Sequence, residues 1–301
     1  LAAERGGRAL RIRAKSALLL AAGGFESNPE MRSRYLPNPT DTAWSTGSTA
    51  STGDGIRMGR SVGGAIELMD EAWWGPTTVV PDEERARMLV IEKGLPGSIF
   101  VNRRGERFVN EASSYTTVVR AMQEKNRTGA ESVPAYMIFD ANYRKKYPCG
   151  PFLQASQQPD WSLPKRFKNG YLRKADTLAG LAAQLGIDPE GLENTAKQMN
   201  EYALKGIDPD FGRGEGAFDQ YYGDAKVEPN PCLAPLDKAP FYGIEAFPGE
   251  LGTKGGLRTD ARARVLDEEG RSIAGLYAVG NCSASVMGPA YPGAGATIGP
   301  A

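Results

Sequence analysis

One tyrosine near the end of the chain lies beside a run of small residues that leaves much of the backbone uncovered. The segment reads MGPAYPGAGATIGPA, with Tyr291 shortly before Gly295. A phenol can donate a hydrogen bond, and glycine lets a backbone N–H come close to a ligand. The sequence contains no histidine. Serine–histidine–aspartate hydrolysis and histidine-ligated metals are therefore excluded, and acid–base chemistry must use Tyr, Lys, Arg, Asp, Glu or the backbone.

Three segments place glycines where a strand or turn could present backbone to a ligand. They are AAGGFE (21–26), YAVGNCSA (277–284) and YPGAGATIGPA (291–301). Glycines let backbone amides approach a ligand, and a helix that starts beside them favours negative charge. Each segment alone is explained more simply as a turn, but we expect the three to converge, and together they predict a dinucleotide cofactor. The G-x-G-x-x-G phosphate motif is missing, because GDGIRMG does not match it. We therefore expect the ADP half of the cofactor to be held by sequence upstream of Leu1.

The composition is that of an ordinary globular protein. The 301 residues are 41% hydrophobic and 24% charged, enough for two domains. Lys+Arg and Asp+Glu both total 36, so no net charge favours nucleic acid or an anionic membrane. The longest apolar run, residues 17–22, is far too short to span a bilayer. Cys149, Cys232 and Cys282 form no CxxC pair, which argues against a metal site and favours a reducing compartment, expected to be the cytoplasm.

The order of the predicted elements indicates an α/β fold. SALLLAAGGFE (16–26) predicts a buried strand that leads to a helix near Asn28–Pro29, and GLYAVGN (275–281) predicts a second strand that ends in glycine. The sequence between these regions has a mixed α+β texture with many loops. We therefore predict a Rossmann-like domain built from residues 1–76 and 251–301, with an α+β domain inserted at 77–250.

Several local features are also predicted from turn and helix signals. Gly6–Gly7 should close a hairpin whose second strand, RALRIRA, is half-buried. Further hairpins should turn near Arg104–Gly105 and Glu269–Gly270, and Pro189 should open the second helix of a helical pair. A last helix should begin around Ala296–Thr297. Both ends look interrupted, which predicts a fragment of a longer protein.

The motifs together resemble the flavoprotein subunits of fumarate reductases and their relatives, and more closely the 3-ketosteroid Δ1-dehydrogenases. The resemblance covers nearly the whole chain, through SALLLAAGGFE, TGDGIRMG, LPGSIFVNRRGERFVNEASSY, PGELGTKGGLRTD, GLYAVGNCSASVMG and YPGAGATIGPA. The first of these motifs are shared by the broad family, and the last four are specific to the steroid branch. The resemblance implies that the Rossmann-like domain binds FAD, that it is incomplete here, and that the inserted domain is catalytic.

The resemblance also implies a reaction and three catalytic groups. Enzymes of this kind remove two hydrogens across carbons 1 and 2 of a 3-ketosteroid ring and pass a hydride to FAD. The Tyr291 hydroxyl and the Gly295 N–H would polarise the 3-keto oxygen toward an enolate. Tyr115 would take the proton from carbon 2, although a phenol of ordinary pKa ~10 is a poor base. A second tyrosine assists this base in the family, and the stretch that carries it is not in this chain.

Other residues receive roles from the same motifs. The predicted cofactor contacts are Ala22, Gly23, Gly24, Asp54, Gly280, Asn281, Ala296, Thr297 and Ile298. Asp54 is equally compatible with a cap on the helix at Gly55. Arg107, Asn110 and Glu111 are expected to hold the loop before Tyr115, and Lys254 is expected to be solvated. Without the resemblance, Tyr115 is explained more simply as a core tyrosine.

Three functional interpretations stay open. A steroid dehydrogenase would have a steroid substrate, FAD and an unidentified electron acceptor as partners. A fumarate reductase relative that acts on a dicarboxylate is the enzymatic alternative, but that branch uses histidine and arginine in its substrate site, and this chain has no histidine. The third is an inactive fragment that folds poorly or binds no flavin.

Overall fold

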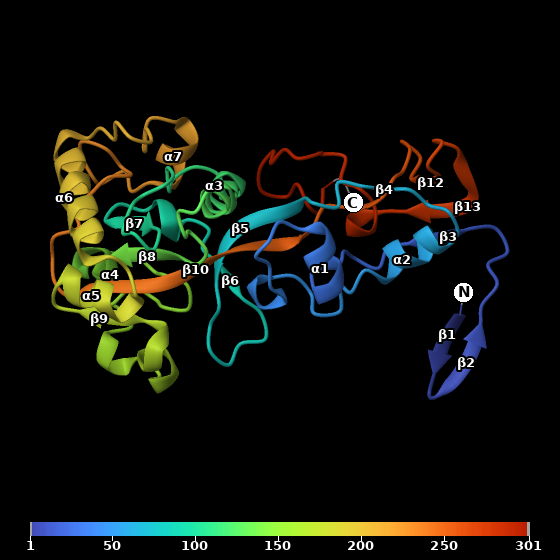
Figure 1. Cartoon of the computed structure of the whole chain (residues 1–301), viewed down its shortest axis with the longest axis horizontal. Coiled ribbons are helices and arrows are strands. Elements are labelled where there is room, and N and C mark those ends of the chain that lie inside the picture. The colour runs from blue at the N-terminus through green and yellow to red at the C-terminus, as the bar shows by residue number, and fades with distance from the viewer. Residues whose placement is uncertain (1, 300–301) are drawn as a thin grey trace. The chain divides into compact units, whose positions relative to one another are not determined.

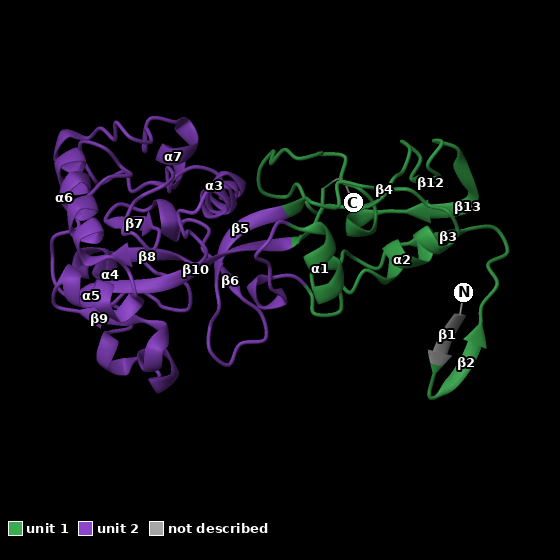
Figure 2. Cartoon of the chain, in the orientation of Figure 1, with its two compact units in different colours: residues 1–36, 48–72, 252–301 green, residues 37–47, 73–251 purple. Residues whose placement is uncertain are grey.

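The computed structural model describes residues 2–299, and its chain divides into two compact units (Figure 2). Unit 1 contains Leu1–Leu36, Ser48–Ala72 and Gly252–Ala301. Unit 2 contains Pro37–Gly47 and Trp73–Leu251. The units are defined by contacts within the chain, and the functional domain limits at 76/77 and 250/251 stay a prediction.

Residues 37–47 belong to unit 2, although segments of unit 1 lie on both sides of them along the chain. The Thr46 N–H donates a hydrogen bond to the Glu250 carbonyl over 3.0 Å. The rings of Trp44 and Phe247 stack with their centroids 5.1 Å apart. These contacts are made across about two hundred residues of sequence. They attach residues 37–47 to the second half of β10 (Phe241–Thr253), the longest strand.

Unit 1 is built from short strands and two helices (Figure 1). Its elements are β1 (Ala2–Arg5), β2 (Arg8–Arg11), β3 (Leu18–Leu20), α1 (Pro29–Tyr35), α2 (Asp54–Ser61), β4 (Ile66–Glu67), β11 (Gly256–Leu257), β12 (Arg264–Leu266), β13 (Ser272–Ala278) and a 3-10 turn at Gly280–Cys282. The order of the three-stranded sheet is β12-β13-β3, and β3 runs parallel to β13 with Leu19 beside Tyr277. A small core of Leu20, Leu257, Val265, Leu276, Ala278 and Cys282 packs under this sheet.

The local predictions for unit 1 are mostly confirmed. The turn at Gly6–Gly7 joins β1 and β2 as an antiparallel hairpin. β2 is exposed along its whole length, so the half-buried strand predicted there is wrong. Helix α1 begins at Pro29, and the Asn28 side chain accepts the Met31 N–H over 3.0 Å, which satisfies one of the unpaired donors of the first turn. The hairpin between β12 and β13 turns at Gly270, which has φ +80°.

Unit 2 holds the larger sheet and most of the helices (Figure 1). Its elements are a 3-10 turn at Thr42–Trp44, β5 (Ala72–Thr78), β6 (Arg87–Met88), a 3-10 turn at Glu92–Gly94, β7 (Ser98–Val101), α3 (Tyr115–Arg127), β8 (Ala135–Phe139), α4 (Ala141–Lys146), helical turns at Asp160–Ser162 and Phe167–Tyr171, β9 (Arg173–Ala175), α5 (Leu178–Leu185), α6 (Pro189–Lys205), α7 (Ala217–Tyr222) and β10 (Phe241–Thr253). The first residue of β5 and the last two of β10 are counted in unit 1. The sheet order is β6-β5-β10-β8-β7, and β9 also pairs with β10.

The predicted helical pair packs on this sheet. α6 begins at Pro189 as expected, and the Asp188 side chain accepts the Glu190 N–H over 3.2 Å. The two helices share a core with the neighbouring strands β7 and β8, made of Ile99, Val101, Tyr136, Ile138, Leu181, Ala182, Leu192, Ala196 and Met199, among others. Three free cysteines, Cys149, Cys232 and Cys282, are buried in the two units.

Candidate functional site

The carboxyl ends of the parallel strands β3 and β13 lie side by side in unit 1. The Val279 N–H donates to the Leu20 carbonyl over 3.1 Å, and the Ala22 N–H donates to Cys282 Sγ over 3.1 Å. Two of the three predicted glycine-bearing segments therefore converge. Ligands of α/β proteins bind at this edge of a parallel sheet.

Glycine is required where these two segments turn. Gly23 has φ +78° and Gly280 has φ +61°, a backbone region that other residues adopt only with strain. A Cβ at Gly23 would also lie 2.8 Å from Ser51 Oγ. Asn281 follows Gly280 and lies beside Gly24, since a Cβ there would be 3.4 Å from the Asn281 Cβ. The predicted residues 23, 24, 280 and 281 thus form one polar, glycine-lined edge.

The start of α2 joins the same edge. The Gly53 N–H donates to the Gly24 carbonyl over 2.9 Å. Gly53 is the N-cap and provides no side chain, so of the two alternatives for Asp54 the structure does not have the helix cap. Asp54 lies instead in the first turn, accepts a hydrogen bond from Thr52 Oγ1 over 3.1 Å and pairs with Arg57. The hydrogen bond from Arg57 lowers the pKa of Asp54 and keeps this half-exposed carboxylate ionised.

The loop that contains Tyr291 and Gly295 has a different character. Tyr291 is partly exposed, and Gly295 has φ +90°, so glycine is the residue that this position accepts without strain. Among the described residues other than its two chain neighbours, no atom lies within 4 Å of the place that a Cβ at Gly295 would take. The space on that side of the Gly295 Cα is therefore open.

The helix predicted from Ala296–Thr297 is not formed within residues 2–299. The segment consists of turns, with the Gly299 N–H donating to the Gly295 carbonyl over 2.8 Å. A helix needs several such bonds in succession before it becomes favourable. Of the predicted contacts here, Ala296 is 9% exposed whereas Ile298 is 82% exposed.

Lys254 is buried, so the prediction that this side chain is solvated is wrong. It is 1% exposed and directly follows β10. Its ammonium donates to the carbonyls of Gly288 and Ala290 over 3.0 and 2.6 Å. A buried ammonium needs such acceptors to offset its lost hydration. The lysine therefore ties the segment just before Tyr291 to the end of the strand.

Tyr115 lies in unit 2 and is the first residue of α3. It is 6% exposed, so the core placement that its sequence alone suggested is what the structure has. The helix is capped by Ser114, whose hydroxyl accepts the Thr117 N–H over 3.3 Å. The ammonium of Lys93 lies 5.7 Å from the centroid of the Tyr115 ring, within range of a cation–π interaction.

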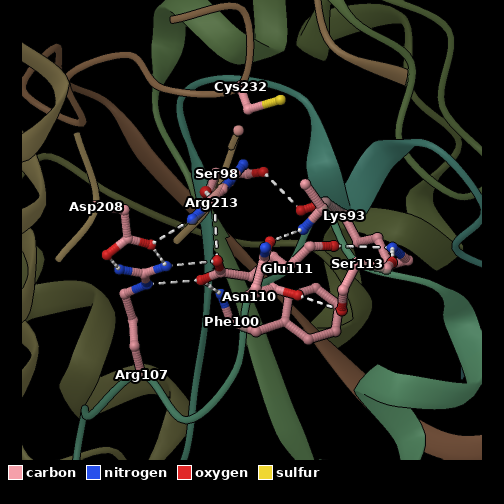
Figure 3. Close-up of polar contacts among 12 residues, drawn as sticks. Lys93, Ser98, Phe100, Arg107, Asn110, Glu111, Ser113, Asp208, Arg213 and Cys232 are labelled. Carbon is pink, nitrogen blue, oxygen red and sulfur yellow. Dashed lines mark hydrogen bonds and ion pairs between the residues drawn. The ribbon is translucent and has the colours of Figure 1, made fainter. Parts of the chain in front are cut away.

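A group of buried charges holds the loop before Tyr115. We call it the Glu111 cluster, and it consists of Lys93, Arg107, Glu111, Asp208 and Arg213. Figure 3 shows the Glu111 carboxylate between two guanidinium groups. Arg107 reaches it over 2.8 Å and Arg213 over 3.1 Å, and Arg107 also pairs with Asp208 over 2.7 Å. Burial raises the pKa of Glu111, but Arg107 and Arg213 outweigh this effect and lower the pKa to about 2.

Lys93 connects this cluster to the start of α3. Its ammonium donates to the Glu111 carbonyl over 2.8 Å and to the Ser113 carbonyl over 2.5 Å (Figure 3). Burial and the neighbouring charge of Arg213 lower the pKa of Lys93 to about 7. The Asn110 amide donates to Asp219 over 2.8 Å. Arg107, Asn110 and Glu111 therefore make direct contacts that are consistent with their predicted role of holding the loop before Tyr115.

Several members of this arrangement were not found from the sequence. Asp208 and Arg213 lie about a hundred residues from the motif in the chain, Lys93 lies just before it, and no periodicity marks any of the three as buried. Charged residues are mostly exposed, so a pattern-based interpretation places them on the surface. The signal that was available is Glu111 in the RRGERFVNEASS motif, because a buried carboxylate requires cationic partners.

Among the side chains that the structure describes, no group of three or more Cys, Asp or Glu is arranged to hold a metal ion. None of the helices within residues 2–299 combines the length and the apolar character that a membrane crossing requires.

Comparison with known proteins gives consistent results. The family model described as FAD binding domain matches residues 1–298. The 3-oxosteroid 1-dehydrogenase of Mycobacterium tuberculosis is 44% identical over 96% of this chain and 51% of its own length. The 4-oxocyclohexanecarboxylate 2-dehydrogenase of Sinomonas cyclohexanicum is 40% identical over 96% of this chain and 50% of its own length.

A solved structure agrees closely in fold. The 3-ketosteroid delta1-dehydrogenase of Sterolibacterium denitrificans, in complex with 1,4-androstadiene-3,17-dione, matches with a TM-score of 0.96 and 48% identity, over 99% of this chain and 53% of that one. The chain thus spans about half the length of the relatives that it matches. Because the family model covers nearly every residue, the chain belongs to the FAD binding domain family.

Proposed function

We propose that the protein carrying this chain is an FAD-dependent dehydrogenase that removes hydrogens from carbons 1 and 2 of 3-ketosteroids, in steroid breakdown. One observation carries the proposal. The fold matches that of a steroid-bound 3-ketosteroid delta1-dehydrogenase at a TM-score of 0.96 over 99% of the chain. The sequence motifs that resemble those of the 3-ketosteroid Δ1-dehydrogenases, the Tyr291–Gly295 segment among them, support the same assignment.

The two units are proposed to divide the work of the enzyme. Residues 1–76 and 251–301 would form part of a Rossmann-like FAD-binding domain, and residues 77–250 would be an inserted α+β domain that provides the base. Unit 1, with its parallel strands, and unit 2, with its antiparallel sheet around β10, support this division. The free, buried cysteines support a cytoplasmic location.

FAD fits the residues at the edge formed by β3 and β13. Gly23, Gly24, Gly280 and Asn281 form a polar edge that turns at glycines of positive φ, and this edge lies at the carboxyl ends of two parallel strands. Ala22, Asp54 and residues 296–298 complete the proposed set. When bound, FAD supplies an acceptor for the hydride that leaves carbon 1.

The chain's own side chains are proposed to handle the ketone and the proton. The Tyr291 hydroxyl and the Gly295 N–H would donate hydrogen bonds to the 3-keto oxygen, stabilising negative charge that develops there as carbon 2 loses its proton. The phenolate oxygen of Tyr115 would take that proton. The open space at Gly295 suits a backbone donor that must approach a flat ligand closely.

The test is an anaerobic absorbance experiment on the purified full-length protein. Addition of 4-androstene-3,17-dione should bleach the flavin band, because the electrons removed from the steroid reduce FAD. A flavin band that bleaches only with 4-oxocyclohexanecarboxylate would keep the ring-ketone chemistry and replace the substrate class. Bleaching only with succinate would move the protein to the dicarboxylate branch, and the absence of any flavin band would refute the proposal.

A further inference from the structure

The Lys254 side chain makes hydrogen bonds to two carbonyls of the loop before Tyr291. One acceptor is the carbonyl of Ala290, at 2.6 Å, and that carbonyl belongs to the peptide group that joins Ala290 to Tyr291. The other acceptor is the Gly288 carbonyl at 3.0 Å. The ammonium therefore holds the peptide plane from which the Tyr291 side chain departs. Rotation of that plane would turn the phenol in a new direction.

The lysine itself is held at both ends. Its backbone N–H donates to the Glu71 carbonyl over 2.9 Å, and its carbonyl accepts the Ser285 N–H over 3.0 Å. The side chain is 1% exposed. A fixed backbone and a buried stem leave the ammonium little freedom, so it can act as a rigid anchor for the loop.

The loop has little of its own to define its shape. Gly288 and Gly293 have positive φ values of 54° and 129°, and Val286 is 78% exposed. The backbone bonds within it are short-range turns, from the Gly288 N–H to Ser285 and from the Ala290 N–H to Met287. Glycines lose more conformational entropy on ordering than other residues do. An external anchor is therefore worth more here than in a helix or strand.

We propose that Lys254 is a positioning residue for Tyr291, and that its ammonium fixes the direction in which the phenol is presented to the substrate carbonyl. The proposal rests on the proposed function, since it gives Tyr291 a ketone to bind. Lys254 acts through the peptide group and needs no contact with the substrate. Misplacing a catalytic group by about 1 Å can cost up to about a hundredfold in rate, so such an anchor has a measurable effect.

A double-mutant cycle in the FAD-loaded, full-length enzyme tests this link. Lys254→Met keeps most of the stem and removes the donors. It should lower kcat for a 3-ketosteroid by about tenfold and change KM much less. In a Tyr291→Phe background the same substitution should change kcat by less than about twofold, because the lysine then has no phenol to orient. Equal losses in both backgrounds would overturn the proposal.

Lys254→Arg supplies the conservative variant. It keeps a cation and several donors at the loop, and it should recover most of the activity lost in Lys254→Met. If Lys254→Met does not fold, Lys254→Gln replaces it in the cycle, because its shorter, neutral amide cannot hold both carbonyls, and its effect on kcat must likewise disappear in the Tyr291→Phe background. Lys197→Met, at an exposed site on α6, is the matched control and should leave kcat unchanged.

Hydrogen exchange separates failure of this proposal from failure of the proposed function. If Tyr291→Phe itself leaves turnover unchanged, the proposed function of Tyr291 is wrong. Amide exchange across residues 285–291 then still reports on the anchor, and it should accelerate in Lys254→Met but not in Lys197→Met. Unchanged exchange in that segment would refute the anchor whatever the activity shows.

Discussion

The segments that lead to Tyr115 and to Tyr291 are both held by a buried lysine through two backbone carbonyls, but the surroundings of the two lysines differ. Lys93 belongs to the Glu111 cluster, which is packed among strands and loops of unit 2. Lys254 holds a glycine-rich loop whose side chains are partly open to solvent. The same kind of contact is therefore found in a closely packed region, which we call the rigid side, and in a glycine-rich, partly exposed loop, which we call the adaptable side. Substitutions within the Glu111 cluster should affect folding, whereas substitution of Tyr291 itself should affect turnover alone.

The largest effect is expected from Tyr115→Phe in the full-length enzyme. Loss of the base should lower kcat by about 10²- to 10⁴-fold, while FAD and steroid still bind, because the ring and its packing remain. The rate of flavin bleaching in a single anaerobic turnover measures the step directly. Bleaching at the wild-type rate would remove Tyr115 from the chemistry and leave it as the core tyrosine that its burial also allows.

Glu111→Gln tests the rigid side of the comparison. Arg107 keeps its ion pair with Asp208, but the buried Arg213 loses the carboxylate with which it pairs, so the free energy of unfolding should fall by about 3–5 kcal/mol. Folded Glu111 has a pKa of about 2, below its ordinary 4.5, so its stabilisation is present above pH 4.5 and is lost as the pH falls toward 2. Urea unfolding should show that Glu111→Gln has a lower free energy of unfolding than the wild type near neutral pH. This difference should shrink as the pH falls. Glu124→Gln, which disrupts an exposed ion pair with Arg127, should change little.

Tyr291→Phe tests the adaptable side. Removing one of two donors to the developing oxyanion should lower kcat by at least about tenfold, and the thermal unfolding midpoint should stay at its wild-type value. Activity should fall without a loss of stability because the loop around Tyr291 contributes little to the core. A variant that loses turnover only in proportion to lost folded protein would contradict it.

The smallest effect concerns Lys93 and pH. Its ammonium faces Glu92, Glu111, Arg213 and Asp219, and its pKa is about 7 in the folded protein against 10.5 ordinarily. The unfolded chain therefore binds the extra proton between these values, so this group makes the protein more stable as the pH rises from about 7 toward 10. Lys93→Met should lack that gain. Parallel pH profiles of the unfolding free energy in the two proteins would show that Lys93 does not titrate in this range.

Local structure was predicted well where a few neighbouring residues decide it. Asn28 and Asp188 cap the helices that begin at Pro29 and Pro189, and Gly6–Gly7 and Gly270 make the expected turns. The meeting of the segments at Gly23 and Gly280 was also predicted, because strands that end in glycine are typical of ligand-binding edges.

The anchors could not be predicted in the same way. Lysine is normally a surface residue, and the acceptors of Lys93 and Lys254 are backbone carbonyls, which have no signature in the sequence. Arg213 meets Glu111 across about a hundred residues, and only the fold brings them together. The helix predicted to begin at Ala296–Thr297 is a different case, because there a local signal was present but the helix does not form. Its residues favour a helix start, but within residues 2–299 too few successive backbone bonds follow.

The three buried cysteines give the two units their own internal reporters. Cys282 lies in unit 1 at 0% exposure, whereas Cys149 and Cys232 lie in unit 2 at 1% and 0%. Burial raises the pKa of each thiol, to about 11 for Cys232, so none of them reacts readily while folded. A thiol reagent can modify them only when the surrounding structure opens. Labelling followed by peptide mass analysis would therefore give the rate at which each unit opens, in a single sample of protein without substitutions.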